Sequence, residues 1–153
     1  CGAGCNTVGF TRGIAVGNAD GTGWHQLNQP ADGSVLPNRY LSSLTIDPAD
    51  NNHVYVTVSG FSRVWTEGPG AGVGHVYESR DGGATWKDLS ANLPDIPANS
   101  LALTDHGGLA VSTDLGVFYR GPHDRFWSVL GEHLPTTATL QLKQGRGAGP
   151  VRC

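Results

Sequence analysis

The most informative segment of the chain is Gly74–Leu89, with the sequence GHVYESRDGGATWKDL. It opens with a short apolar run, passes through a Gly-Gly pair and ends in the pattern Trp-x-x-Leu. Strand-forming residues on both sides of a Gly-rich turn are typical of a β-hairpin. Because glycine adopts positive φ without steric cost, Gly82 and Gly83 are expected to form the turn.

Two other segments repeat this hairpin. They read GIAVGNADGTGWHQL (Gly13–Leu27) and GVFYRGPHDRFWSVL (Gly116–Leu130). Each begins with Gly and an apolar strand and ends with Trp-x-x-Leu, and the Gly-to-Trp spacing is eleven, twelve and eleven residues in chain order. Self-similarity of this kind indicates a repeat architecture.

Further strands are predicted between the hairpins, where apolar residues alternate with polar ones around Asp-, Asn- and Gly-rich turns. We call the four strands of one repeat A to D, and the chain then reads C-D, A-B-C-D, A-B-C-D, A, eleven strands in all, with no convincing helix pattern. The strands of the first complete repeat are expected at Leu41–Ile46, His53–Val58, Gly74–Ser79 and Thr85–Leu89; those of the next lie near Ser100, Leu109, Gly116 and Arg125, and a last A strand covers Thr137–Lys143.

The predicted fold class is therefore all-β, built from four-stranded antiparallel propeller blades. The blades cover residues 13–143, between an N-terminal tail (1–12) and a C-terminal tail (144–153). About two and a half blades do not close a ring, so we expect an incomplete ring or a fragment of a longer chain. The absence of Met also indicates a processed or excised piece.

A resemblance to a known superfamily supports this interpretation. Ser79, Asp81, Gly83, Thr85 and Trp86 follow the pattern Ser-x-Asp-x-Gly-x-Thr-Trp, which resembles the Asp-box (BNR repeat) of sialidase-like β-propellers of the bacterial secreted type. The resemblance implies structural roles for these five residues. The Asp carboxylate is expected to accept hydrogen bonds within the turn. The tryptophans of the three hairpins, Trp24, Trp86 and Trp127, are each expected to be buried beside a neighbouring blade.

The two outer hairpins depart from the Asp-box pattern. Gly17–Trp24 keeps the Trp but has its acidic residue at Asp20, and Arg120–Trp127 has Pro122 and His123 where the pattern fails. The resemblance does not identify a substrate, because sialidases, xyloglucanases, sortilin-type receptors and non-enzymatic assembly factors all contain this motif.

Composition excludes several function classes. Charged residues make up 15% of the chain, the formal net charge is −3, and Lys and Arg form no run, so nucleic acid is a poor candidate partner. No apolar run reaches the ~18 residues of a membrane span. The six His residues lack metal-ligand spacing and Gly-x-Ser-x-Gly is absent, so neither a metal nor a cofactor is expected.

The three cysteines lie near the two ends, at Cys1, Cys5 and Cys153. A Cys5–Cys153 bridge would need the two ends to meet and would suit an oxidising compartment, whereas three free thiols are the alternative. An extracellular or periplasmic location is expected from the resemblance.

A ligand site is expected where the longer connections gather. In an up-and-down blade the A–B and C–D turns share one end, so the long segments Asn28–Arg39, Ser59–Val73 and Ser90–Asn99 fall at the other, and long loops on a rigid scaffold commonly carry binding groups. An aromatic face can stack on a sugar ring while charged groups bond its hydroxyls. The candidate ligand-binding residues are Phe61, Arg63, Trp65, Glu67, Arg39 and Tyr40; packing of Phe61 and Trp65 onto a neighbouring blade is the alternative.

Three functions remain open at this point. The first is a secreted module that binds or scaffolds a carbohydrate or a protein. The second is part of a sialidase- or xyloglucanase-like glycoside hydrolase, with most catalytic residues outside this chain; no catalytic residue can be named, because no carboxylate pair can be assembled. The third is a lectin-like ring formed by oligomerisation. The expected partners are a glycan or protein ligand, and the remaining blades of a longer chain or further copies of this one.

Overall fold

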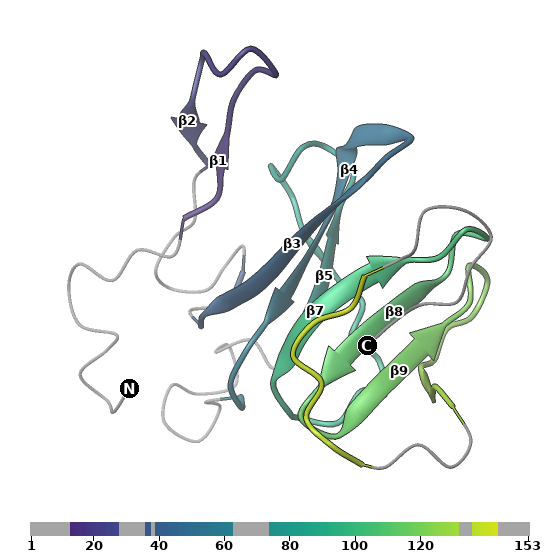
Figure 1. Cartoon of the computed structure of the whole chain (residues 1–153). Coiled ribbons are helices and arrows are strands. Elements are labelled where there is room, and N and C mark those ends of the chain that lie inside the picture. Colours follow the sequence, from purple (N-terminus) through teal and green to yellow (C-terminus); the bar gives the residue numbers. More distant parts are fainter. Residues whose placement is uncertain (1–12, 28–35, 38, 63–73, 132–135, 144–153) are drawn as a thin grey trace, which may run out of the picture.

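The computed structural model describes residues 13–27, 36–37, 39–62, 74–131 and 136–143. Within them the chain forms ten β-strands and no helix (Figure 1). The predicted all-β class with antiparallel pairing is confirmed. The strands are β1 Ala15–Val16, β2 His25–Gln26, β3 Leu41–Asp47, β4 Asp50–Val58, β5 Val76–Ser79, β6 Lys87–Asp88, β7 Ala98–Leu103, β8 Leu109–Thr113, β9 Gly116–Arg120 and β10 Ser128–Val129.

Two four-stranded sheets form the centre of the structure. Each is a meander in which consecutive strands pair, in the orders β3-β4-β5-β6 and β7-β8-β9-β10. The A–B pairs have matching registers, with Leu44 opposite Val56 in one sheet and Leu101 opposite Val111 in the other. Strands β1 and β2 form a separate two-stranded hairpin. The predicted A-to-D strand order is thus present in both complete units.

The three Trp-x-x-Leu hairpins share one backbone register. The N–H groups of Leu27, Leu89 and Leu130 donate at 2.8 Å to the carbonyls of Ile14, Val76 and Val117, respectively, and donor and acceptor are equally far apart along the chain in each pair. The uneven Gly-to-Trp spacing in the sequence therefore reflects only the placement of Gly74, one residue earlier than its counterparts. The hairpin itself has the same length each time.

The two sheets pack face to face. Because side chains alternate across a strand, Tyr55 and Val76 point to one face of the β3–β6 sheet, and Val56 and Tyr77 point to the other. The first face packs against the β7–β10 sheet. This interface cluster consists of Tyr55, Val76 and Leu89 from one sheet and Ala98, Leu101, Leu109, Val111 and Trp127 from the other.

The opposite face of the β3–β6 sheet packs against the β1–β2 hairpin. Ile14 and Leu36 join Val56, Val58 and Tyr77 in a second buried cluster, with Leu27 and Trp86 partly buried against it. The stacking order is therefore the β1–β2 hairpin, the β3–β6 sheet and the β7–β10 sheet, which Figure 1 shows side by side.

The predicted last strand at Thr137–Lys143 is not formed as a strand. Residues 136–143 run along the β7–β10 sheet (Figure 1), but they form only an isolated bridge at Lys143. Thr139 N–H donates to the Thr113 carbonyl at 3.0 Å, and Leu142 packs against Ala102, Ala110 and Val117. A strand needs a continuous ladder, and no described residues pair along the other side of this segment.

Burial of all three repeat tryptophans was expected, and it is wrong for Trp24. Trp127 is 4% exposed between the two sheets, whereas Trp24 is 65% exposed. The Trp24 ring lies over Gly17, where an added Cβ would come within 2.6 Å of the indole. The reason is positional, because among the described residues no sheet packs on the outer side of the β1–β2 hairpin.

Some predictions fall outside the described residues. They concern the two tails with Cys1, Cys5 and Cys153, and the part of the B–C loop that carries Arg63, Trp65 and Glu67. For the described part of the chain, no helix has the length and hydropathy needed to cross a bilayer.

Candidate functional site

The connections between strands divide the stacked sheets into two ends. At the turn end, the β3–β4 turn lies beside the β5–β6 turn, where Gly82 N–H donates to the Asn52 carbonyl at 2.9 Å. At the loop end, Arg39 and Tyr40 enter β3, Phe61 and Ser62 leave β4, and Asp95 lies between β6 and β7. The expected candidates Arg39, Tyr40 and Phe61 therefore share one end of the structure.

Asp95 is the centre of the polar network at the loop end. Its Oδ1 accepts the Ser62 backbone N–H at 2.7 Å and lies 2.9 Å from His75 Nε2, while its Oδ2 accepts the Ser62 hydroxyl at 2.6 Å. Desolvation opposes ionisation of Asp95, but the hydrogen bonds from Ser62 and His75 outweigh it and lower the Asp95 pKa. The carboxylate is thus held ionised, with a side chain that remains 45% exposed.

His75 is buried beneath this carboxylate. Burial lowers its pKa, and the nearby positive charge of Arg39 lowers it further. Its Nδ1 lies 3.2 Å from the Val58 carbonyl, and its Nε2 makes the shorter contact with Asp95. A neutral imidazole has one N–H, which we assign to Nε2 because that contact is shorter and its acceptor is ionised.

Arg39 does not point into solvent as a ligand-binding cation would. The side chain is buried, and its guanidinium donates to the carbonyls of Gly60, at 3.2 Å, and Gly74. These carbonyls lie at the end of β4 and before β5, so Arg39 joins the two ends of the B–C connection. These contacts give Arg39 a structural role, and its part in ligand binding stays a prediction.

Tyr40 and Phe61 are the exposed aromatic side chains at the loop end. The Tyr40 carbonyl accepts the Ser59 N–H at 2.9 Å, which fixes the backbone of both strands at this point. Ser62, the neighbour of Phe61, is held by Asp95. Among the described residues, the loop end thus offers two exposed aromatic rings and an anchored, partly exposed carboxylate.

Ser62, His75 and Asp95 were not predicted as a group. Ser62 and His75 lie near the two ends of the β4–β5 connection, and Asp95 lies in the β6–β7 connection. The sequence placed Ser62 and Asp95 in long connections at the loop end, but no signal linked the three side chains. The Ser62 hydroxyl donates to Asp95 rather than to an imidazole, so the geometry differs from a Ser–His nucleophilic pair.

The Asp-box residues form a closed network at the turn end. Asp81 Oδ1 accepts the Ser79 hydroxyl at 2.8 Å and the Thr85 N–H at 2.9 Å, and Oδ2 accepts the Thr85 hydroxyl at 2.5 Å. The hydrogen bonds from Thr85, followed by the one from Ser79, lower the Asp81 pKa to about 2. Gly82 and Gly83 have φ of 70° and 96°, as expected, and Gly83 N–H donates to the Ser79 hydroxyl oxygen at 2.7 Å.

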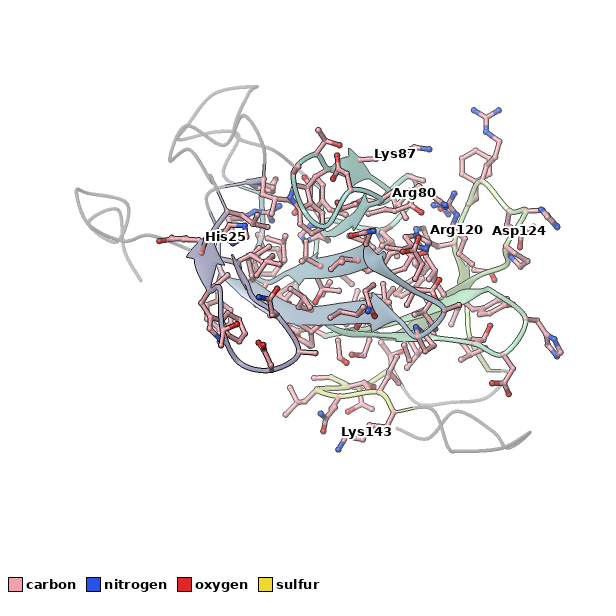
Figure 2. All side chains as sticks on the ribbon, turned by 90° about the horizontal axis from the view of Figure 1, so that it is seen from above. His25, Arg80, Lys87, Arg120, Asp124 and Lys143 are labelled. Atoms are coloured by element: carbon pink, nitrogen blue, oxygen red, sulfur yellow. The ribbon has the colours of Figure 1, made fainter. Side chains whose placement is uncertain are left out.

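A second polar cluster lies beside this turn. His53 has Asp47 Oδ2 3.1 Å from Nδ1 and Glu78 Oε1 2.8 Å from Nε2, and Arg80 donates to the same Glu78 oxygen at 2.7 Å. Arg80 lies with Arg120 and Asp124 on the side of the molecule away from His25 (Figure 2). No group of acidic, His or Cys side chains in the described residues has the arrangement of a metal site.

Comparison with known proteins adds no identification. No protein-family model matches this sequence, and no curated protein matches it.

Proposed function

We propose that this chain belongs to an Asp-box β-propeller of the secreted type, located outside the cell or in the periplasm, and that its loop end binds a carbohydrate. Two stacked meander sheets, three hairpins in one register and the Asp81 network support the propeller assignment. Each is expected of neighbouring blades, in which a Trp-bearing hairpin of one sheet covers the face of the previous one.

The observation that carries the binding proposal is the grouping at the loop end. Exposed Tyr40 and Phe61 share the loop end with Asp95, which bonds the neighbour of Phe61, Ser62, and whose lowered pKa favours the ionised form. Aromatic rings bind the apolar face of a sugar, and a carboxylate accepts hydrogen bonds from its hydroxyls. Because Ser62 and His75 already fix the carboxylate, little conformational entropy is lost on binding.

A glycan array followed by calorimetry on the best glycan tests the proposal. Tyr40→Ala and Phe61→Ala are each expected to weaken binding on the order of tenfold, about 1.4 kcal/mol. The matched control is Phe126→Ala, because Phe126 lies at the turn end and is 64% exposed against 56% for Phe61. Equal loss in the control, or no binding to any glycan, would contradict the proposal.

The alternatives give different outcomes in related assays. Release of chromophore from a glycoside panel, abolished in Asp95→Asn, would favour a glycoside hydrolase over a binding module. Retention of a protein rather than a glycan, lost in Tyr40→Ala, would favour a scaffold for protein partners.

A further inference from the structure

Equivalent residues of the three hairpins lie in three successive interfaces. Ile14, Val76 and Val117 occupy the same hairpin position, as their hydrogen bonds show. Ile14 belongs to the cluster between the β1–β2 hairpin and the β3–β6 sheet, and Val76 to the cluster between the two sheets. Val117 lies on the outer face of the β7–β10 sheet, with Leu130 partly buried beside it. The outer face of the β7–β10 sheet therefore presents the same hairpin position that is buried in the two complete interfaces.

The inner strands repeat in the same way. Ser42 Oγ donates to the Ala98 carbonyl at 2.5 Å, and one step later Asn99 Nδ2 donates to the Thr139 carbonyl at 3.2 Å. Segment 136–143 therefore occupies, against β7, the place that β7 occupies against β3. By this alignment Leu140 takes the position of Ser42 and Asn99, whose side chains reach the following inner strand.

The equivalence of β3, β7 and segment 136–143 shows which apolar side chains of the described residues have no neighbouring sheet packed on them. Leu44, Leu101 and Leu142 are equivalent, and they are 46%, 4% and 5% exposed, respectively. The β3–β6 sheet covers Leu101 and the β7–β10 sheet covers Leu142. Leu44 faces the other side, where the described residues that pack are those of the β1–β2 hairpin and Leu36.

The tryptophans show the same pattern. Trp127 covers the previous sheet and donates from Nε1 to the Leu89 carbonyl at 2.8 Å, and Trp86 packs against the cluster around Ile14. Trp24 is the exposed member, with a neighbouring sheet on one side only. The indole acceptor differs among the three hairpins, because Trp24 Nε1 donates to the Gly21 carbonyl of its own turn at 3.0 Å and Trp86 Nε1 is buried without a hydrogen-bond partner among the described residues. What Trp86 and Trp127 share is the packing of the ring on the previous unit.

The uncovered residues form two complementary faces. The leading face carries Trp24, Leu44 and Ile46, and the trailing face carries Leu130 and Leu140; of these, all but the partly buried Leu130 are exposed. Among the described residues, the leading face has an outer hairpin without an inner strand beside it, and the trailing face has the extended inner segment 136–143 without an outer hairpin. Since the two sheets separate these faces, they cannot meet within one copy.

We propose that the leading face of one copy binds the trailing face of a second copy. Trp24 then covers Leu130 as Trp127 covers Leu89, and Leu140 lies beside β3 of the partner. Two copies joined head to tail through both faces supply four complete four-stranded sheets, within the four to eight blades of known propellers, so a closed dimer is expected rather than an open polymer. The proposal rests on the propeller architecture but not on ligand binding, so loss of glycan binding leaves it untouched.

Sedimentation and light scattering on the intact chain test the contact. The unaltered protein is expected to be a dimer that dissociates on dilution. Trp24→Ala is expected to weaken the dimer by about 30-fold, as for a central interface Trp, without loss of the β-sheet signal in circular dichroism. Phe126→Ala, a similarly exposed aromatic of the turn end, is the matched control and should not change the dimer.

A mixing experiment distinguishes the head-to-tail contact from other dimers. Trp24→Ala disables only the leading face and Leu140→Glu only the trailing face, so the two variants together retain one intact interface. The mixture is expected to form a heterodimer at a concentration where each variant alone is monomeric. A monomeric unaltered chain, an open polymer, a dimer that survives Trp24→Ala, or no heterodimer in the mixture would each overturn the proposal.

Discussion

The β5–β6 and β9–β10 hairpins have the same register but different turn chemistry. In the first, Asp81 accepts hydrogen bonds from Ser79 and Thr85. In the second, Pro122 stands at the position of Asp81, and Asp124 Oδ2 accepts the Gly121 N–H at 3.0 Å instead. The two hairpins nevertheless place their tryptophans on the previous structural unit.

The comparison separates two requirements of the repeat. The Trp-x-x-Leu segment is needed in both hairpins because it fills an interface, while the turn needs only some acceptor for its N–H groups. In the second hairpin Asn92 adds support, since its Oδ1 accepts the Trp127 N–H at 2.7 Å and its Nδ2 donates to the Trp127 carbonyl at 2.9 Å. The Asp81 network and the Asp124 contact are thus two different ways to close this turn.

The largest effect is expected for Trp127→Ala. Trp127 is buried in the interface between the two sheets, so its removal should leave a cavity and leave the Leu89 carbonyl with only the longer hydrogen bond from Arg120, at 3.4 Å. The free energy of unfolding should fall by about 3–5 kcal/mol, measured by urea denaturation. Trp86→Ala, at the equivalent but less buried position, should cost less; an equal or larger loss there would break the comparison.

Asp81→Ala should destabilise the protein more than Asp124→Ala. Removal of Asp81 leaves the Thr85 N–H and two hydroxyls without their acceptor, whereas Asp124 Oδ2 serves the Gly121 N–H alone. The melting temperatures of the two variants, read under identical conditions, check this order. The reverse order would show that the Asp-box is not the stronger closure.

A smaller effect is expected for Asn92→Ala. The variant loses both hydrogen bonds to the Trp127 backbone, at a partly exposed site, so the cost should be about 1 kcal/mol. Urea denaturation measures this loss of unfolding free energy. Asn99→Ala serves as a comparison, because it also removes an amide side chain but leaves the Trp127 backbone bonds in place. No change in Asn92→Ala would mean that packing alone positions Trp127.

The smallest effect is expected in the dependence of stability on pH below 3.8, where Asp81 becomes protonated. The Asp81 pKa is about 2 in the folded protein and 3.8 as the ordinary value, so its ionised form stabilises the fold above pH 3.8, and this contribution is lost as the pH falls toward 2. In Asp81→Asn the slope of stability against pH in this window should be shallower. Identical slopes would show that the Asp81 hydrogen bonds do not favour its ionised form.

His75 provides a matching test at the loop end, in a different pH window. Burial lowers its pKa below the ordinary 6.5, so the unfolded chain binds a proton first as the pH falls. The stability that neutral His75 contributes is therefore complete above pH 6.5 and declines below it. NMR titration of the imidazole checks the direction of the shift.

The hairpins and their order could be predicted from the sequence because their causes are local. Alternation with a period of two, glycine at positive φ and a short-range acceptor such as Asp81 act between residues close in the chain. Strand order and the place of Gly82 and Gly83 therefore follow from the residues alone. The expectation failed for Trp24 and for Thr137–Lys143, where burial or pairing depends on a neighbour that the described residues do not supply.

Only the tertiary structure decides the candidate site. Ser62 and His75 come from opposite ends of the β4–β5 connection and Asp95 comes from the β6–β7 connection, and they meet because the β3–β6 sheet brings the ends of its strands together. Arg39 was predicted as a ligand-binding cation from its place before a strand, but packing turns it toward the carbonyls of Gly60 and Gly74. Sequence patterns report which side chains a strand can present, whereas desolvation and the geometry of distant acceptors determine which of them remain available to a ligand.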